Sequence, residues 1–145
     1  MEISENNLKK FVGIKFEYGK CSSYSCDCFG LFLLILKEHS KNQELYNSLH
    51  NVFYQSFYNQ PLCFEKMHQM LLHCTTNSHN NHNTLVVIQI KNRLHCGIIF
   101  LSQGFPNGTP MALHSLEKHG VVITSLERFF EFGTEIARFE LEKML

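Results

Sequence analysis

Asp27-Cys-Phe-Gly-Leu-Phe-Leu-Leu-Ile-Leu36 contains the longest apolar run of the chain, and Lys37, Glu38 and His39 follow it. A run that is apolar on nearly every side and ends in cationic residues predicts a helix that is buried on all faces. Asp27 would cap this helix by accepting a hydrogen bond from a backbone N–H of the first turn. A buried strand is the alternative, because a short apolar run does not distinguish strand from helix.

The N-terminal half otherwise predicts short helices that are separated by loops. Residues 5–12 predict one helix, which ends at Gly13, and residues 43–58 predict an amphipathic one. Pro61 opens a further helix, whose apolar face is expected to include Leu62, Met67, Met70 and Leu71. The segments 14–26 and 75–83 are rich in Gly, Ser or Asn and predict loops.

The C-terminal half instead predicts strands. The segments 84–90, 94–101, 111–115, 121–124 and 135–141 are β-branched or alternate, with turns at 91–93 and 117–120. Residues 104–108 predict a loop, with Gly104, Pro106 and Gly108 as its turn residues, and Ser125 is expected to cap a short helix. Helices followed by an antiparallel meander indicate the α+β class, with residues 1–145 as a single domain.

Composition limits the function further. The chain has 145 residues, of which 44% are hydrophobic and 18% charged, and this excludes an intrinsically disordered chain. Lys+Arg and Asp+Glu are both 13, so there is no basic excess and we expect no nucleic-acid partner. The longest apolar run is shorter than the roughly 20 residues that cross a bilayer, so we expect no membrane insertion. The opening MEISENNLKK lacks the features of a secretory signal, which predicts synthesis in the cytoplasm and six free thiols.

Cys28 is the strongest candidate nucleophile among these thiols. The first turn of a helix presents unpaired N–H groups and the positive end of the helix dipole, and both lower the pKa of a thiol. The same N–H groups can bind the oxyanion that forms on an attacked carbonyl. The alternative is that Cys28 is a small buried apolar residue, which is common for cysteine.

Two histidines are candidates for the base that such a thiol requires. His95 and His114 lie within apolar segments of neighbouring predicted strands, and two such strands can bring the rings together on one face. A base beside the thiol and a polar group that orients the base would complete the site. The alternative is that both are hydrogen-bonded structural histidines.

A structural zinc site is the competing interpretation of the Cys and His content. The paired, repeated spacing typical of zinc sites is absent from the sequence. The residues that could still supply ligands are Cys21, Cys26, Cys28, His73, Cys74, His79 and His82. Cys63, Cys74 and Cys96 are otherwise expected to pack in helices or strands.

The segments 11–19 and Cys26-Asp-Cys-Phe-Gly-Leu31 resemble the opening of the NlpC-type cell-wall peptidases, which are papain-like cysteine endopeptidases. His95-Cys96-Gly97-Ile98 resembles the family's His-x-Gly-Ile strand, and Ala112-Leu113-His114-Ser115 resembles its third block. Gly120-Val121-Val122 resembles the Gly-Val-Val segment that follows this histidine in the branch of the family found in phage tails and gene transfer agents. The resemblance covers roughly residues 8–140.

The resemblance implies a papain-like fold, with N-terminal helices packed on an antiparallel sheet and no cofactor. It implies Cys28 as nucleophile, His95 as base and His114 as the orienting residue, with substrate contacts at Asp27, Tyr18 and Phe29. The implied reaction is hydrolysis of the peptidoglycan stem peptide, commonly after D-glutamate. The implied setting is a phage-like particle that carries the protein to the cell wall, with tail proteins as partners.

One departure from the family pattern leaves an alternative open. Phe16 stands where an active-site tyrosine is usual, and it has no hydroxyl group. A structural tail component that keeps the fold without activity is therefore the second hypothesis.

Overall fold

The computed structural model describes residues 2–56, 60–104 and 107–145. Within these ranges the chain forms five α-helices, an antiparallel five-stranded sheet and a separate two-stranded sheet. The α+β class predicted from the sequence is therefore confirmed. The N-terminal half contributes four of the helices, α1 (Glu5–Lys9), α2 (Cys28–His39), α3 (Gln43–Ser56) and α4 (Gln60–Met70).

Helix α2 lies at the centre of the molecule. Eight of its residues are buried, which matches the expectation from a run that is apolar on all sides. The helical prediction is thus confirmed, and the strand alternative is wrong. The Asp27 side chain caps the helix, because its Oδ1 accepts a hydrogen bond from the N–H of Gly30 at 2.8 Å.

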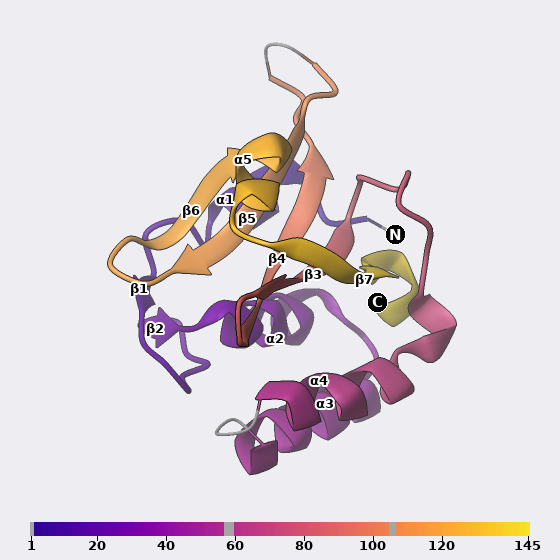
Figure 1. Cartoon of the computed structure of the whole chain (residues 1–145). Coiled ribbons are helices and arrows are strands. Elements are labelled where there is room, and N and C mark those ends of the chain that lie inside the picture. The colour runs from indigo at the N-terminus through magenta and orange to yellow at the C-terminus, as the bar shows by residue number, and fades with distance from the viewer. Residues whose placement is uncertain (1, 57–59, 105–106) are drawn as a thin grey trace.

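Helix α3 packs against the side of α2 that faces away from the sheet, and α4 packs beside α3 and also contacts β4 (Figure 1). The predicted helix over 43–58 is observed as far as Ser56, and its last two positions lie outside the described residues. The predicted face of α4 is wrong at Leu62, whose side chain is 38% exposed. Met67 and Leu71 are buried as predicted, and Cys63 is buried in place of Leu62, because residues four apart follow one face of a helix.

The five-stranded sheet has the order β6-β5-β4-β3-β7. The first four strands form a meander, and the last strand crosses to the opposite edge and pairs with β3. The prediction of a simple meander is therefore wrong for the last strand. The crossing covers the free edge of β3, an apolar strand buried for most of its length. The strands are β3 (Thr84–Ile90), β4 (Arg93–Leu101), β5 (Pro110–Leu116), β6 (Gly120–Ser125) and β7 (Thr134–Glu140).

Helix α5 (Leu126–Glu131) connects β6 to β7 and lies on the face of the sheet opposite to α2 (Figure 1). Ser125 caps it as predicted, accepting a hydrogen bond from the N–H of Arg128. Two apolar clusters result, a large one between the sheet and the N-terminal helices and a small one under α5. The loop predicted over 104–108 includes positions 105 and 106, which lie outside the described residues.

The segment 14–26 is more ordered than the loop that was predicted for it. Two short strands, β1 (Lys15–Phe16) and β2 (Ser25–Cys26), pair in parallel. Backbone hydrogen bonds in both directions join Gly13 and Ile14 to Val121 of β6. This pairing holds the segment beside the sheet, so that Phe16 and Tyr18 reach the start of α2.

Gly30 permits the segment 14–26 to cross the first turn of α2. A Cβ atom at this position would lie 2.0 Å from the carbonyl oxygen of Lys20, which no contact allows. The same carbonyl accepts a hydrogen bond from the N–H of Asp27, so it cannot move away without breaking that bond. The Gly of the Asp-Cys-x-Gly segment is therefore a requirement of backbone packing.

We expect Gly30→Ala to lower the free energy of unfolding by about 2–3 kcal/mol, because the added methyl group must displace backbone. Urea unfolding followed by circular dichroism measures this loss. Gly104→Ala is the matched control, since the nearest atom to its added Cβ would be the Ser102 Oγ at 3.4 Å. Equal stability of the two variants would contradict the prediction.

Candidate active site

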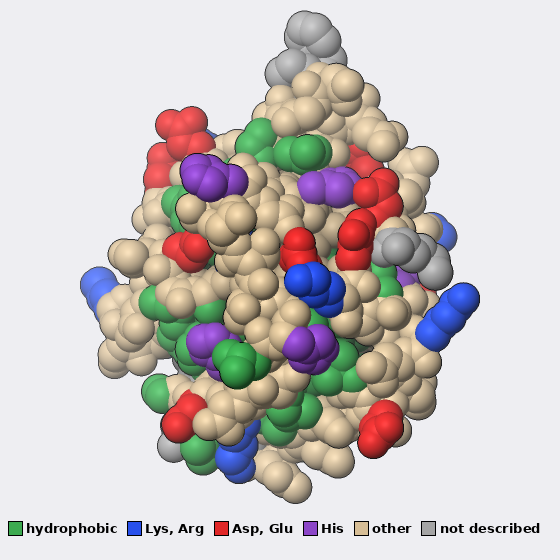
Figure 2. Space-filling view, turned by 90° about the vertical axis from the view of Figure 1, so that its right-hand side faces the viewer, with side chains coloured by type: hydrophobic (Ala, Val, Ile, Leu, Met, Phe, Trp, Pro, Cys, Tyr) green, Lys and Arg blue, Asp and Glu red, His purple; other side chains and the backbone are tan. Residues whose placement is uncertain are grey.

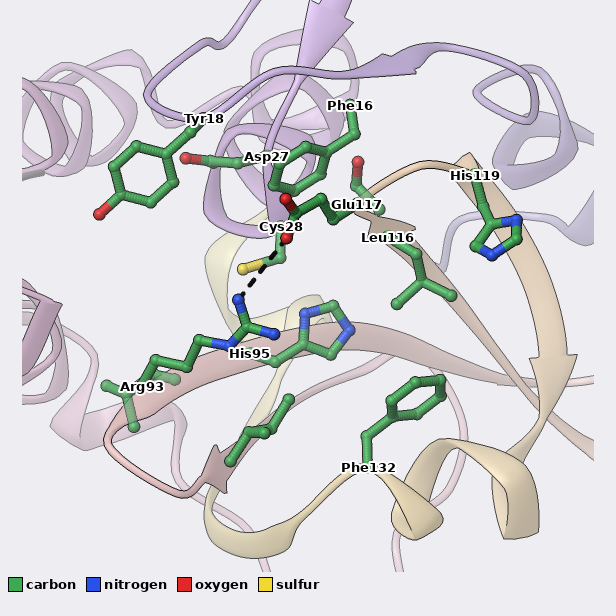
Figure 3. A pocket seen from close by; sticks show the side chains of 13 residues that line it. Phe16, Tyr18, Asp27, Cys28, Arg93, His95, Leu116, Glu117, His119 and Phe132 are labelled. Carbon is green, nitrogen blue, oxygen red and sulfur yellow. Dashed lines mark ion pairs between the residues drawn. The ribbon is translucent and has the colours of Figure 1, made fainter.

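An open pocket of about 460 Å³ lies where the first turn of α2 meets the start of β4 and the end of β5. Figure 3 shows Cys28 and His95 facing this pocket, with Phe16 and Tyr18 on one side and Phe132 on the other. The remaining lining comes from the end of β3, from β4 and β5, and from the segment between β5 and β6. The residues that line it are Phe16, Tyr18, Asp27, Cys28, Ile90, Arg93, Leu94, His95, Ser115, Leu116, Glu117, His119 and Phe132.

Cys28 is the first residue of α2, and its side chain is 7% exposed. Its pKa is lowered well below the usual value for a thiol. The largest cause is a hydrogen bond from the Cys96 side chain, and a hydrogen bond and the charge of His95 add to it, while burial opposes both. A lowered pKa increases the fraction of Cys28 that is present as thiolate, which is the nucleophilic form.

His95 connects Cys28 to His114. Its Nε2 lies 2.8 Å from Nδ1 of His114, and the bond is buried. Figure 3 shows a ring nitrogen of His95 on the side of Cys28, in agreement with the hydrogen bond between these two side chains. The structure thus brings together the three side chains that the sequence singled out, with the two histidines on one face of the sheet and Cys28 at the start of α2.

The strand register explains why the two histidines meet. Ile98 pairs with Leu113, so Gly97 lies opposite His114. His95 is two residues before Gly97 and therefore lies on the same face of the sheet. A Cβ atom on Gly97 would lie 3.3 Å from Cβ of His114 and 2.7 Å from the ring of Phe129. The absence of a side chain at Gly97 therefore lets the His114 ring lean toward His95.

Aromatic rings from α5 and the residue after it enclose the two histidines. Phe129 and Phe132 contact both rings, with centroids 5.1–6.2 Å apart. His114 is fully buried, and burial, with the charge of His95, lowers its pKa to about 3. His114 is consequently neutral at physiological pH and can accept a hydrogen bond from a charged His95.

The three residues expected to contact substrate occupy different places. Tyr18 lies at the pocket, where about half of its side chain is exposed. Asp27 lines the pocket too, but its oxygens accept hydrogen bonds from Gly30 and Gly19, so it braces the backbone. Phe29 does not reach the pocket, because its side chain packs in the apolar core against α3. The expectation for Phe29 is therefore wrong.

The burial of Asp27 has an electrostatic consequence. Burial raises the pKa of its carboxyl group to about 7, and the negative charge of Cys28 adds to the shift. The hydrogen bonds from the N–H groups of Gly30 and Gly19 oppose it. The carboxyl group is therefore partly protonated near neutral pH, which limits its repulsion of the neighbouring thiolate.

Sequence reasoning missed several residues at this site. Cys96 was expected only to pack, yet its thiol hydrogen-bonds Cys28 from the opposite side of β4 to His95. Arg93 was expected in a turn but begins β4, and its Nη1 lies 3.8 Å from Oε2 of Glu117 across the pocket mouth (Figure 3). Alternation along β4 could have indicated that Cys96 faces α2, on the opposite side of the strand to His95. No local pattern indicates the Arg93–Glu117 pair, because two separate turns bring these residues together.

The candidate zinc ligands are not gathered in one place. Among residues 2–56, 60–104 and 107–145, no group of three or more His, Cys, Asp and Glu side chains is arranged to hold a metal ion. One of these candidates, His82, has other partners. Its Nε2 lies 2.6 Å from Oε2 of Glu2, and its Nδ1 accepts a hydrogen bond from the N–H of Leu101. His82 thus holds the N-terminal arm against the end of β4.

The surface shows charges of both signs. Figure 2 shows basic and acidic side chains interspersed over one face, as the equal numbers of Lys+Arg and Asp+Glu lead one to expect. None of the helices in the described part of the chain is long and apolar enough to cross a membrane.

Comparisons with known proteins add no family to this geometry. No protein-family model matches the chain, and no curated protein matches it.

We expect Cys28 to be alkylated first among the six thiols at neutral pH, since its pKa is lowered whereas burial raises the pKa of Cys21, Cys26 and Cys63 to about 11–12. Limiting iodoacetamide, followed by mass spectrometry of each cysteine peptide, measures the order. As the pH falls, labelling of Cys28 should persist below the range in which an ordinary thiol becomes unreactive.

Two variants of Cys96 provide the control for this prediction. Cys96→Ser keeps a hydrogen-bond donor, so Cys28 should stay reactive at mildly acidic pH, whereas Cys96→Ala removes the donor and should slow its alkylation there. Earlier labelling of Cys21 or Cys63 than of Cys28 in the unmodified chain would show that the thiolate is not stabilised at this site.

Proposed function

We propose that the chain is a cysteine endopeptidase with the papain-like fold of the NlpC-type cell-wall peptidases, and that it hydrolyses the stem peptide of peptidoglycan. The observation that carries the proposal is the unbroken chain of contacts from Cys28 through His95 to His114 at the edge of an open pocket. Two histidines with only a structural role would not require a neighbouring thiol of lowered pKa, and strongly shifted pKa values are typical of functional sites. The motifs Asp-Cys-x-Gly-Leu and His-x-Gly-Ile, which supply Cys28 and His95, support the same family.

The acylation step uses Cys28 and His95. The Cys28 sulfur attacks the carbonyl carbon of the scissile bond, and the carbonyl oxygen takes the negative charge. The backbone N–H of Cys28, at the first position of α2, is one of the N–H groups that have no acceptor within the helix, and it can bind this oxygen. When the C–N bond breaks, charged His95 gives its proton to the leaving amine, and a thioester remains on Cys28.

Deacylation restores the resting state. Neutral His95 takes a proton from water, whose oxygen attacks the thioester carbon. The C–S bond breaks, the carboxylic acid leaves, and the proton on His95 again faces the Cys28 thiolate. His114, held neutral by burial, accepts the Nε2–H of His95 throughout and keeps the ring in place.

The pocket mouth suits a substrate with free carboxylates. Arg93 and Glu117 are both mostly exposed, so their ion pair contributes little to stability. A carboxylate of the stem peptide can therefore replace Glu117 as the partner of Arg93 at small cost. The γ-D-glutamyl-diamino acid bond is flanked by such carboxylates, and it is the bond that we propose is cleaved.

The setting that we propose is a phage-tail or gene-transfer particle that acts on the cell wall. Its support is the sequence similarity of Gly120-Val121-Val122 to that branch of the family. The second candidate function, an inactive structural tail component, is favoured by Phe16, which lines the pocket without a hydroxyl group. Tyr18 lines the same pocket and offers a hydroxyl from the same segment, which favours the enzyme.

Digestion of purified peptidoglycan, with the released peptides analysed by mass spectrometry, tests the enzyme directly. We expect Cys28→Ala and His95→Asn to lower turnover by about a thousandfold or more, because each removes a group that makes or breaks bonds. His114→Asn keeps an oxygen that can accept the His95 N–H, so a loss of about 10–100-fold is expected.

The inactive component predicts a different result. Folded wild-type protein would release no peptides, or would release them at the same rate as Cys28→Ala. His114→Asn that is folded and as inactive as His95→Asn would instead show that the two histidines have been assigned the wrong roles.

We expect Arg93→Gln to raise KM for a stem-peptide substrate about 3–10-fold and to leave kcat nearly unchanged, because an exposed charge contributes to binding and not to chemistry. Steady-state kinetics on a soluble stem peptide measures both constants. Lys41→Gln is the control, since it removes an exposed cation from the connection between α2 and α3. A loss of kcat with unchanged KM would exclude the binding role.

A further inference from the structure

We propose that Thr124 is a positioning residue of this site. Its hydroxyl oxygen accepts the Nε2–H of His114, and this leaves Nδ1 of His114 free to accept the Nε2–H of a positively charged His95. The inference rests on the proposed function, because it matters only where Cys28 and His95 form a thiolate–imidazolium pair.

Two short contacts carry the argument. Nε2 of His95 lies 2.8 Å from Nδ1 of His114, and Nε2 of His114 lies 3.0 Å from Oγ1 of Thr124. Each imidazole nitrogen of His114 thus has one partner, and a neutral imidazole has only one N–H to share between them. The position of that proton decides in which direction the hydrogen bonds run.

The charge on His95 determines this direction. A charged imidazole has an N–H on both nitrogens, so His95 donates one to Cys28 and the other to His114. Nδ1 of His114 must then be the acceptor, which places the His114 proton on Nε2, and this proton needs an acceptor of its own. A hydroxyl oxygen can accept, whereas a hydrocarbon at position 124 would leave a buried N–H unpaired.

The opposite arrangement would disable the site. With its proton on Nδ1, His114 would donate to Nε2 of His95, and a neutral His95 would keep its single proton on the nitrogen that faces Cys28. His95 then could not take the thiol proton. Thr124 therefore permits the ion-paired form, since its hydroxyl oxygen can accept the N–H of the only tautomer of His114 that a charged His95 allows, whereas a hydrocarbon could not.

The fold places Thr124 for this role. Ala112 pairs with Thr124 and His114 with Val122, so Thr124 is the diagonal neighbour of His114 on the same face of the sheet. His114 is fully buried, whereas Thr124 is half-buried and lines a second hollow beside Arg128 and Phe132. The hydroxyl hydrogen can thus turn toward solvent while its oxygen accepts from His114.

Other ionisable groups also act on the Cys28–His95 pair. Cys96 contacts Cys28 directly, and Asp27 adjoins it. The pocket mouth adds Arg93, Glu117 and His119, and Arg128 and Glu131 line the hollow beside Thr124. The variants at position 124 leave all these groups unchanged, so they isolate the effect of the hydroxyl.

The test compares Thr124→Val, which keeps the shape without the hydroxyl, with Thr124→Ser, which keeps the hydroxyl. Iodoacetamide alkylation of Cys28 in the full chain is followed against pH by mass spectrometry of the Cys28 peptide. We expect the Thr124→Val profile to move toward higher pH by about one unit, with alkylation about tenfold slower below its midpoint. Thr124→Ser should keep the wild-type profile.

The outcomes separate this inference from the proposed function. An unchanged profile in Thr124→Val, or an equal shift in Thr124→Ser, overturns the role of the hydroxyl. A wild-type Cys28 that is alkylated only at the pH of an ordinary thiol overturns the proposed function instead. If Thr124→Val does not fold, nitrogen NMR of histidine-labelled wild type decides: a His114 proton on Nε2 supports the inference, and a proton on Nδ1 overturns it.

Discussion

The two hydrogen bonds that the Asp27 carboxyl group accepts hold together the junction on which the site depends. One oxygen caps α2 through the N–H of Gly30, and the other accepts the N–H of Gly19 from the segment that crosses the helix. The carbonyl of Lys20 closes the same junction by accepting the N–H of Asp27. The start of α2, which carries Cys28, and the segment that carries Phe16 and Tyr18 are therefore positioned as one unit. Ser115 of β5 fastens this unit to the sheet, because its hydroxyl donates to the carbonyl of Cys26.

The two faces of the sheet have different tasks at the site. The face toward α2 presents Cys96, whose thiol stabilises the charge on Cys28. The face toward α5 presents His114 within the aromatic rings of Phe129 and Phe132. His95 lies near the start of β4, where the strand reaches the pocket, and it contacts both Cys28 and His114. Burial lowers the pKa of His114 to about 3, so this ring is neutral and can accept a hydrogen bond from His95.

Much of the fold follows from local pattern. The apolar run after Asp27 is stable only when it is buried on all sides, and Asp27 before it predicts a capped helix, which the structure confirms. The β-branched runs after residue 84 similarly specify strands, and the change from helices to strands specifies the α+β class. Local sequence pattern did not predict the pairing of strands that are far apart in the sequence. The edge to which β7 returns and the pairing of β1 with β2 depend on which strand edges remain free after the core has formed.

For the site, the sequence by itself determined which groups are the candidates for chemistry. Cys28 at a predicted helix start, two histidines in apolar strands and the motifs around them were enough to select these candidates without coordinates. Only the tertiary structure decided their partners. The register that places Gly97 opposite His114, the approach of Cys96 to Cys28, and the contact of Thr124 with His114 each join residues from different elements. The burial of Phe29 was decided in the same way, since the face of α2 that meets α3 depends on how the helices pack. Distances between such residues depend on strand register and helix packing, which the whole core determines and no short segment encodes.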